Sequence, residues 1–187
     1  MPTVAFFLKR EQPDAVDLCH RLCRRLSHGL VAAHRDESDP AWEPLVLRNR
    51  ATAGSPAPSG AFFADGVRYV EEADLPPDLG LLVVLGGDGT LLYGSGLLKD
   101  PRTPVLGINL GHLGFLTACS PPDAEVTLQL AQRGELPIED RQRLRCRLLR
   151  QGQVLAERAA VNDVVLSQAE KSAFFILGQA MTKTETS

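Results

Sequence analysis

A single carboxylate stands among glycines in the segment Leu81–Leu98, LLVVLGGDGTLLYGSGLL. The glycines around it are Gly86, Gly87 and Gly89. They remove side-chain bulk, so a phosphate could approach the main chain there, and Thr90 adds a hydroxyl and an N–H. Phosphates would repel the carboxylate of Asp88 unless it held a magnesium ion or accepted a proton from an attacking hydroxyl. We expect this carboxylate to be unshielded at the tip of a strand.

The same residues are compatible with an ordinary tight turn, because Asp-Gly is a common turn dipeptide. An apolar strand before the motif and a helix after it favour ligand binding, since ligands of βα units gather beyond the carboxyl ends of strands. The segment is neither a Walker A loop nor a G-x-G-x-x-G motif. Gly94 and Gly96 lie within the predicted helix, where close packing explains them.

A second glycine group, GINLGHLGFL, follows the next apolar run. Gly111 and Gly114 would open a wall, and Leu113 and Phe115 would offer apolar surface to a nucleobase. The alternative is that Phe115 and its neighbours belong to the hydrophobic core.

A third group, VNDVVLS, places Asn162 and Asp163 side by side before an apolar run. An amide and a carboxylate together could hold the two hydroxyls of a ribose. Asn-Asp is also ordinary turn chemistry, so this pair alone leaves both interpretations open.

The elements that must position these residues follow from hydrophobic periodicity. Strands are predicted at Thr3–Leu8, Leu45–Leu47, Leu81–Leu85 and Pro104–Asn109, and helices at 13–30 (with Asp14 as N-cap and Gly29 as stop), Thr90–Leu98 and 121–135. A surface loop is predicted at 49–61, which is rich in Pro, Gly, Ser and Ala. Alternating strands and helices predict an α/β fold with a Rossmann-like, doubly wound parallel sheet.

Beyond Leu136 the pattern changes, because arginines alternate with apolar residues around a turn-like QGQ. That alternation predicts antiparallel strands with one solvated face. We therefore expect a nucleotide-binding domain at 1–135, which includes GGDGT, and an incomplete, β-rich domain at 136–187.

Bulk composition restricts the class of protein. The 187 residues are 44% hydrophobic and 23% charged with a net charge of −3, which gives no indication of nucleic-acid binding. No apolar run approaches the roughly 20 residues that span a bilayer, and the N-terminal pattern is not secretory. Four cysteines without a C-x-x-C pair are typical of reduced thiols, so we expect a cytoplasmic protein without membrane partners. Cys19, His20 and Cys23 do not share one helix face, and we assign no residue as a metal ligand.

Three segments in order, LGGDGTLL, GINLGHLGFLT and AVNDVVLS, resemble the NAD kinase family, and ELPIEDRQRLRCRL resembles its link into a second domain. GGDGT alone also occurs in diacylglycerol and sphingosine kinases, whereas the GHLGF and ND segments favour the NAD kinase branch. The resemblance implies transfer of the terminal phosphate of ATP, or in some members polyphosphate, to the 2′-hydroxyl of the NAD adenosine ribose. The product would be NADP, with Mg2+ required and a homo-oligomer (dimer or tetramer) as the assembly.

The resemblance also implies residue roles. Asp88 corresponds to the base that engages the 2′-hydroxyl, and Gly89 and Leu92 line the same site. Phe115 with Leu113 and Leu116 corresponds to the adenine-binding part. Asn162 and Asp163 correspond to a pair that binds NAD hydroxyls.

The resemblance stops after Ser167, where the chain continues as QAEKSAFFILGQAMTKTETS. The family's Thr-Pro-x-Gly-Ser-Thr-Ala-Tyr type segment is absent from this sequence. We therefore expect a truncated second domain with a divergent tail, and a chain that alone is weakly active or inactive. The alternatives are a GGDGT-type lipid kinase and a non-catalytic nucleotide-binding fragment.

Overall fold

The structure, a computed structural model, describes residues 2–9, 12–27, 42–48, 67–111, 114–117 and 119–161. The chain forms two compact units, Met1–Ile138 and Glu139–Ser187. The loop expected at 49–61 and the helix stop expected at Gly29 lie outside the described residues.

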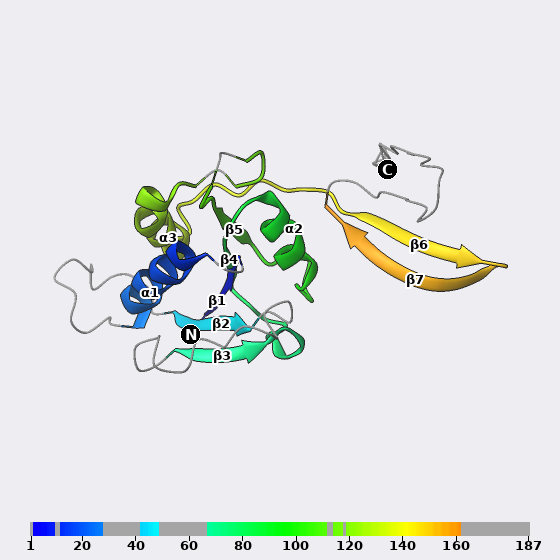
Figure 1. Cartoon of the computed structure of the whole chain (residues 1–187), viewed down its shortest axis with the longest axis horizontal. Helices are drawn as coiled ribbons and strands as arrows, with labels where there is room; N and C mark the ends of the chain where they lie inside the picture. The colour runs from blue at the N-terminus through cyan, green and yellow to red at the C-terminus, as the bar shows by residue number, and fades with distance from the viewer. Residues whose placement is uncertain are drawn as a thin grey trace. The chain divides into compact units, whose positions relative to one another are not determined.

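The first unit is built on a sheet of five parallel strands in the order β3-β2-β1-β4-β5 (Figure 1). The strands are β1 (Thr3–Leu8), β2 (Glu43–Arg48), β3 (Arg68–Glu71), β4 (Leu81–Leu85) and β5 (Val105–Ile108). The chain runs outward from β1 through β2 to β3, then crosses to β4 on the other side of β1. The prediction of a doubly wound parallel α/β sheet is confirmed.

The central strands form because they are continuous apolar runs that both faces of the sheet can bury. All five residues of β4 are buried, and β1 pairs with it from Val4 beside Leu81 to Leu8 beside Leu85. The edge strand β3 was not predicted. Its sequence, RYVE, has charged ends and one buried residue, Val70, so it lacks the apolar run by which the other strands are detected.

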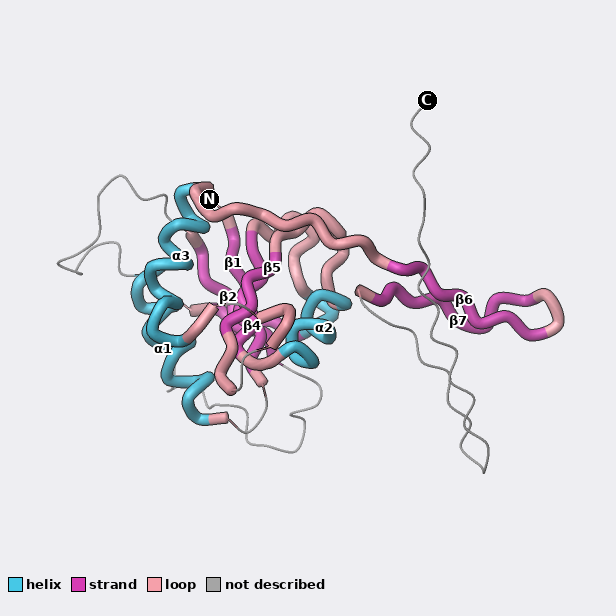
Figure 2. Tube along the Cα trace, turned by 90° about the horizontal axis from the view of Figure 1, so that it is seen from above, coloured by secondary structure: helices cyan, strands magenta, loops and turns pink. Residues whose placement is uncertain are grey.

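Among the described residues, three helices cover the sheet: α1 (Pro13–Ser27), α2 (Asp88–Gly96) and α3 (Ala124–Arg133). Figure 2 shows α1 and α3 on one side of the strands and α2 on the other. Helix α1 begins at Pro13, so Asp14 lies in its first turn and is not the N-cap. Helix α2 begins two residues earlier than predicted, which makes Asp88 its first residue and Gly87 its N-cap.

The remaining regular structure of the first unit is short. In the described part of this unit, the 3-10 turn Glu72–Asp74 follows β3, and the 3-10 turn Pro121–Asp123 precedes α3. Gly134 ends α3 in the left-handed conformation, with φ of 71°. Among the described residues, no helix is long and apolar enough to cross a membrane.

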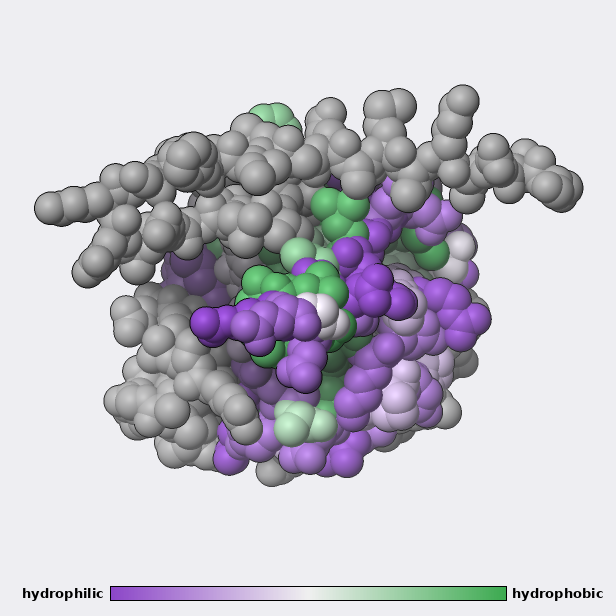
Figure 3. Space-filling model, turned by 90° about the vertical axis from the view of Figure 1, so that its right-hand side faces the viewer, coloured by the Kyte–Doolittle hydropathy of each residue, from purple (hydrophilic) through white to green (hydrophobic). Residues whose placement is uncertain are grey.

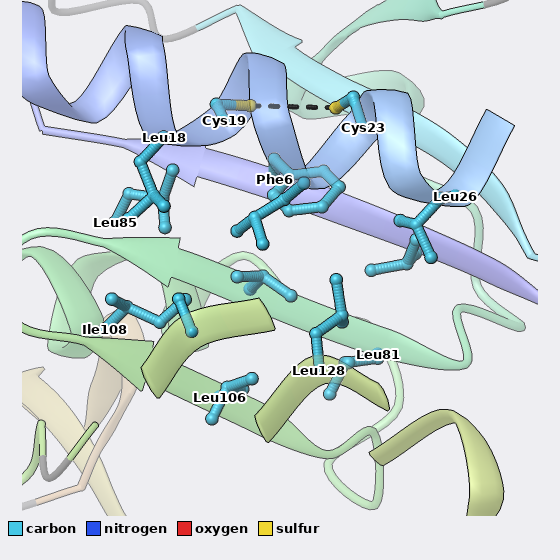
Figure 4. Packing of buried hydrophobic residues seen from close by; sticks show 14 of the residues in the cluster. Phe6, Leu18, Cys19, Cys23, Leu26, Leu81, Leu85, Leu106, Ile108 and Leu128 are labelled. Atoms are coloured by element: carbon cyan, nitrogen blue, oxygen red, sulfur yellow. Dashed lines mark hydrogen bonds between the residues drawn. The ribbon is translucent and has the colours of Figure 1, made fainter. Parts of the chain in front are cut away.

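One hydrophobic core lies between the sheet and helices α1 and α3 (Figure 4). Its fully buried members include Phe6, Leu18, Leu22, Leu85, Ile108 and Leu128. Cys19 and Cys23 face each other in this core with their Sγ atoms 3.8 Å apart, and both are free thiols. In the described part of the chain, no three His, Cys, Asp or Glu residues gather as a metal site.

A second core lies on the α2 side of the sheet. A Cβ atom on Gly94 would lie 3.2 Å from Phe7 and 3.3 Å from Val84, so the expected close packing is confirmed there. The same explanation is wrong for Gly96, because a Cβ there would meet nothing within 4 Å. Close packing against the sheet therefore explains the glycine at position 94, on the inner face of α2, and does not explain the one at position 96.

In the second unit, the described residues include one antiparallel hairpin of β6 (Leu144–Arg150) and β7 (Gln153–Ala160). Gln151 and Gly152 form its turn, both with positive φ, as a two-residue turn of type I′ requires. The predicted antiparallel strands are confirmed. Several large apolar residues here are more than half exposed: Leu148, Leu149, Val154 and Leu155. Figure 3, which shows one face of the whole chain, has patches of apolar surface (green) among hydrophilic surface (purple).

Candidate functional site

The GGDGT residues lie where ligands bind in doubly wound sheets. Strand β4 ends at Leu85, beside the carboxyl end of β1, and the order of the strands reverses between these two. The turn after β4 is tied to both neighbouring strands. The N–H of Lys9 donates to the carbonyl of Leu85 at 2.8 Å, and the N–H of Gly86 donates to the carbonyl of Ile108 at 3.0 Å.

Asp88 contacts the second glycine group directly, through the residues Gly114–Thr117, here called the 114–117 loop. Oδ2 of Asp88 accepts the N–H of Phe115 at 2.9 Å. Oδ1 accepts the N–H groups of Leu116 and Thr117 at 3.1 and 3.2 Å, and the hydroxyl of Thr117 at 3.0 Å. The sequence led us to expect an unshielded carboxylate, and this expectation is wrong. Four donors from a distant segment surround the carboxylate of Asp88.

These contacts determine the charge state of Asp88. Partial burial acts to raise the pKa of the carboxyl, but the hydrogen bonds from Phe115, Leu116 and Thr117 outweigh it and lower the pKa below the ordinary 3.8. The group is ionised at neutral pH. It is a strong hydrogen-bond acceptor and a weak proton acceptor.

Sequence reasoning missed Thr117 as a functional residue. Its side chain is completely buried, and its hydroxyl is the one side-chain donor to Asp88 in the described part of the chain. A Cβ on Gly107 would lie 2.8 Å from Cγ2 of Thr117, so a glycine in β5 makes room for this side chain. Thr117 is the last residue of GHLGFLT, and no local sequence pattern singles it out.

Gly114 is required for the contact between the two glycine groups. A Cβ atom there would collide with the carboxylate of Asp88, at 2.7 Å from Cγ and 2.9 Å from Oδ2. Gly111 on the same segment has no such restriction, since its Cβ would come no closer than 3.8 Å to Asn109. The two glycines predicted to open a wall therefore differ in function.

The glycines of GGDGT also differ from one another. Gly86 is buried beneath Thr90, whose Oγ1 would lie 2.6 Å from a Cβ on that glycine. Gly87 and Gly89 face open space, because a Cβ on either would meet nothing within 4 Å. Main chain at the N-terminus of α2 is thus approachable at these two positions, where a helix leaves N–H groups without a partner in the helix.

The predicted apolar residues around Asp88 have different environments. Phe115 is 98% exposed, so the alternative that it belongs to the core is wrong. Leu116 is partly buried and packs against the core on the α2 side, and Leu92 is half-buried. Phe115 therefore has an exposed aromatic ring, while its backbone N–H donates to Oδ2 of Asp88.

Three predicted site residues lie outside the described residues: Leu113, Asn162 and Asp163. Their roles stay predictions. The described residues that meet at the carboxyl end of β4 are the GGDGT segment and the 114–117 loop.

Comparison with known proteins identifies relatives of this arrangement. The family model of the ATP-NAD kinase N-terminal domain matches residues 4–136. An NAD kinase of Heliobacterium modesticaldum is 35% identical over 91% of this chain and 53% of its own length. An NAD kinase of Geotalea daltonii is 40% identical over 90% of this chain and 52% of its own length.

A solved structure, yeast NADH kinase complexed with NADH, is similar in fold. Its TM-score is 0.68 at 23% identity, covering 87% of this chain and 47% of the yeast chain. The chain thus spans about half the length of the curated relatives that it matches. The family model covers most of the sequence, including both glycine groups. The chain belongs to the ATP-NAD kinase family.

Proposed function

We propose that this chain provides the α/β half of an NAD kinase, which transfers the terminal phosphate of ATP to the 2′-hydroxyl of the NAD adenosine ribose. Membership of the family supports this reaction class. The main structural observation in its favour is the Asp88 carboxylate, ionised and held by the 114–117 loop at the carboxyl end of β4.

The two oxygens of Asp88 are not equivalent. Among the described residues, three donors reach Oδ1, whereas one donor, the N–H of Phe115, reaches Oδ2. An ionised carboxylate offers about four acceptor positions in all, so Oδ2 retains capacity for a further donor. We assign that capacity to the 2′-hydroxyl of the substrate ribose.

A hydroxyl held in this way is oriented more than it is deprotonated. Phosphoryl transfer passes through a loose transition state, so positioning and charge neutralisation contribute most of the catalysis. A carboxylate with a lowered pKa can position the hydroxyl, but it accepts the proton only late in the reaction. Asp88 then aligns the attacking oxygen, with base catalysis as a secondary contribution.

The exposed ring of Phe115 suits the adenine of NAD, because a flat apolar face favours stacking of a base. We keep Leu116 and Leu113 as the neighbouring apolar residues of this base site, and Asn162 and Asp163 as contacts to NAD hydroxyls. Leu92 would line the same site from α2.

The triphosphate of the donor suits the N-terminus of α2. Gly87 and Gly89 present bare main chain there, and helix N-termini favour anions. Asp88 does not fit the role of a magnesium ligand, since N–H donors already surround its carboxylate. Magnesium therefore enters as part of the MgATP substrate, and no side chain of the described residues is assigned to it.

The wider properties of the protein are also proposals. We propose a cytoplasmic homo-oligomer. Weak NADP formation at most is expected of the chain itself, since it spans about half the length of its relatives.

The test is NADP formation by the purified chain, measured with an NADP-specific dehydrogenase. We expect a slow rate in the parent and a further loss of about 100-fold in Asp88→Asn, because misplacing a reacting group by 1 Å can cost that much. Asp100→Asn is the matched control: its pKa is also lowered, by hydrogen bonds from Arg102, but it lies beyond the opposite end of α2. Phosphorylation of diacylglycerol in place of NAD would favour the lipid kinase alternative, and equal rates in parent and Asp88→Asn would exclude Asp88 from the reaction.

A further inference from the structure

We infer that Thr117 is a positioning residue for Asp88: its buried hydroxyl occupies Oδ1 and leaves Oδ2 as the oxygen offered to the acceptor hydroxyl of the substrate. This inference rests on the proposed function and assigns a task to a residue outside GGDGT. Thr117 would act through Asp88, without touching the substrate.

Two donors of one residue converge on the same oxygen. The N–H of Thr117 lies 3.2 Å from Oδ1 of Asp88, and the hydroxyl of Thr117 lies 3.0 Å from it. With the N–H of Leu116 at 3.1 Å, these donors fill the acceptor capacity of Oδ1. A partial rotation of the carboxylate would move this oxygen away from its three donors and leave the hydroxyl of Thr117 without an acceptor.

The position of Thr117 leaves its hydroxyl little freedom. The side chain has no exposed surface, and Cγ2 lies where a Cβ on Gly107 would come within 2.8 Å. A buried hydroxyl needs a hydrogen-bond partner, because leaving it without one costs free energy. Burial on the methyl side and hydrogen bonding on the hydroxyl side therefore fix the same rotamer.

Two substitutions separate the hydroxyl from the shape of the side chain. Thr117→Val keeps the volume and both branches at Cβ but removes the donor. Thr117→Ser keeps the donor but removes the methyl group that packs beside Gly107. A positioning role predicts harm from valine and rescue by serine, whereas a packing role predicts the opposite order.

The readout is the carboxyl carbon of Asp88, followed by NMR during a pH titration of the 187-residue chain and assigned by its loss in Asp88→Asn. Removing the hydroxyl donor removes one of the interactions that favour the charged form. We therefore expect the pKa of Asp88 to rise in Thr117→Val and to stay near the parent value in Thr117→Ser. Backbone amide spectra verify that each variant remains folded over the range used.

The matched control is Thr103→Val, the same substitution at a threonine that is also buried and that lies outside the set of donors to Asp88. It should leave the Asp88 titration unchanged. An unchanged pKa in Thr117→Val, or a shift in Thr117→Ser as large as that in Thr117→Val, would overturn the inference.

Addition of NAD to the same samples distinguishes this inference from the proposed function. NAD should move the Asp88 carboxyl signal in the parent and in Thr117→Ser, and Thr117→Val should need about fivefold more NAD for the same change. A parent whose Asp88 signal ignores NAD would contradict the proposed function, while the pKa order of the variants would still decide how Thr117 acts on Asp88.

Discussion

Replacing Gly114 by alanine should detach the 114–117 loop from Asp88. The added Cβ would lie 2.7 Å from Cγ of Asp88 and 2.9 Å from its Oδ2. Gly114 is not among the positive-φ glycines of the described residues, so the backbone tolerates alanine and the collision alone determines the effect.

The size of the displacement follows from these distances. Carbon atoms in contact are about 3.5 Å apart or more, so the carboxylate and the loop must separate by about 1 Å. The hydrogen bonds to Asp88 have lengths of 2.9 to 3.2 Å, and such a shift takes them out of bonding range. We expect the pKa of Asp88 to rise toward its ordinary value as these donors are lost.

Amide hydrogen exchange measures this separation directly. The N–H groups of Phe115, Leu116 and Thr117 should exchange about tenfold faster in Gly114→Ala, because a hydrogen bond to a charged group contributes at least that factor. Gly111→Ala is the control on the same segment, where the new Cβ would have only an ordinary contact at 3.8 Å. Unchanged exchange at all three amides of Gly114→Ala, or equal acceleration in Gly111→Ala, would refute the reasoning.

Three further predictions concern stability, monitored by urea denaturation with the fluorescence of the single tryptophan, Trp42, which is buried in the first unit. Leu128→Ala should lower the free energy of unfolding by about 2–5 kcal/mol, because it removes a completely buried side chain from the core beneath α3. Gly134→Ala should lower it by about 1 kcal/mol, since φ of 71° strains any residue with a Cβ; an unaltered midpoint in either variant would contradict the packing or the helix end described. The lowered pKa of Asp88 stabilises the folded state above the ordinary 3.8, and this contribution is lost as the pH falls through the folded-state pKa. The difference in unfolding free energy between parent and Asp88→Asn should therefore shrink as the pH falls from the ordinary 3.8 through the folded-state pKa, and a constant difference down to acid pH would contradict the lowered pKa.

The sequence predicted the elements whose residues are uniformly apolar. Strands β1 and β4 were located to the residue, because each is a continuous apolar run with polar residues or glycines at its ends. The start of α2 was misplaced, since an aspartate between glycines has no helical periodicity of its own. Strand β3 was missed because only Val70 is buried in it.

The candidate site was predicted in its parts but not in its contacts. Each glycine group was recognised in isolation, and the position of Asp88 at the end of β4 follows from local sequence. Its hydrogen bonds come from residues 27 to 29 positions away, which only the pairing of β4 with β5 brings near. Thr117 has no local pattern that distinguishes it from any other buried threonine.

The most direct test of the central claim is transfer of label from radioactive ATP to NAD by the purified chain, a measurement sensitive enough for a weak enzyme. We predict labelled NADP from the parent and from Asp100→Asn, and at least about 100-fold less from Asp88→Asn at saturating NAD. Equal labelling by the parent and Asp88→Asn would contradict the proposal that Asp88 aligns the ribose hydroxyl for phosphorylation.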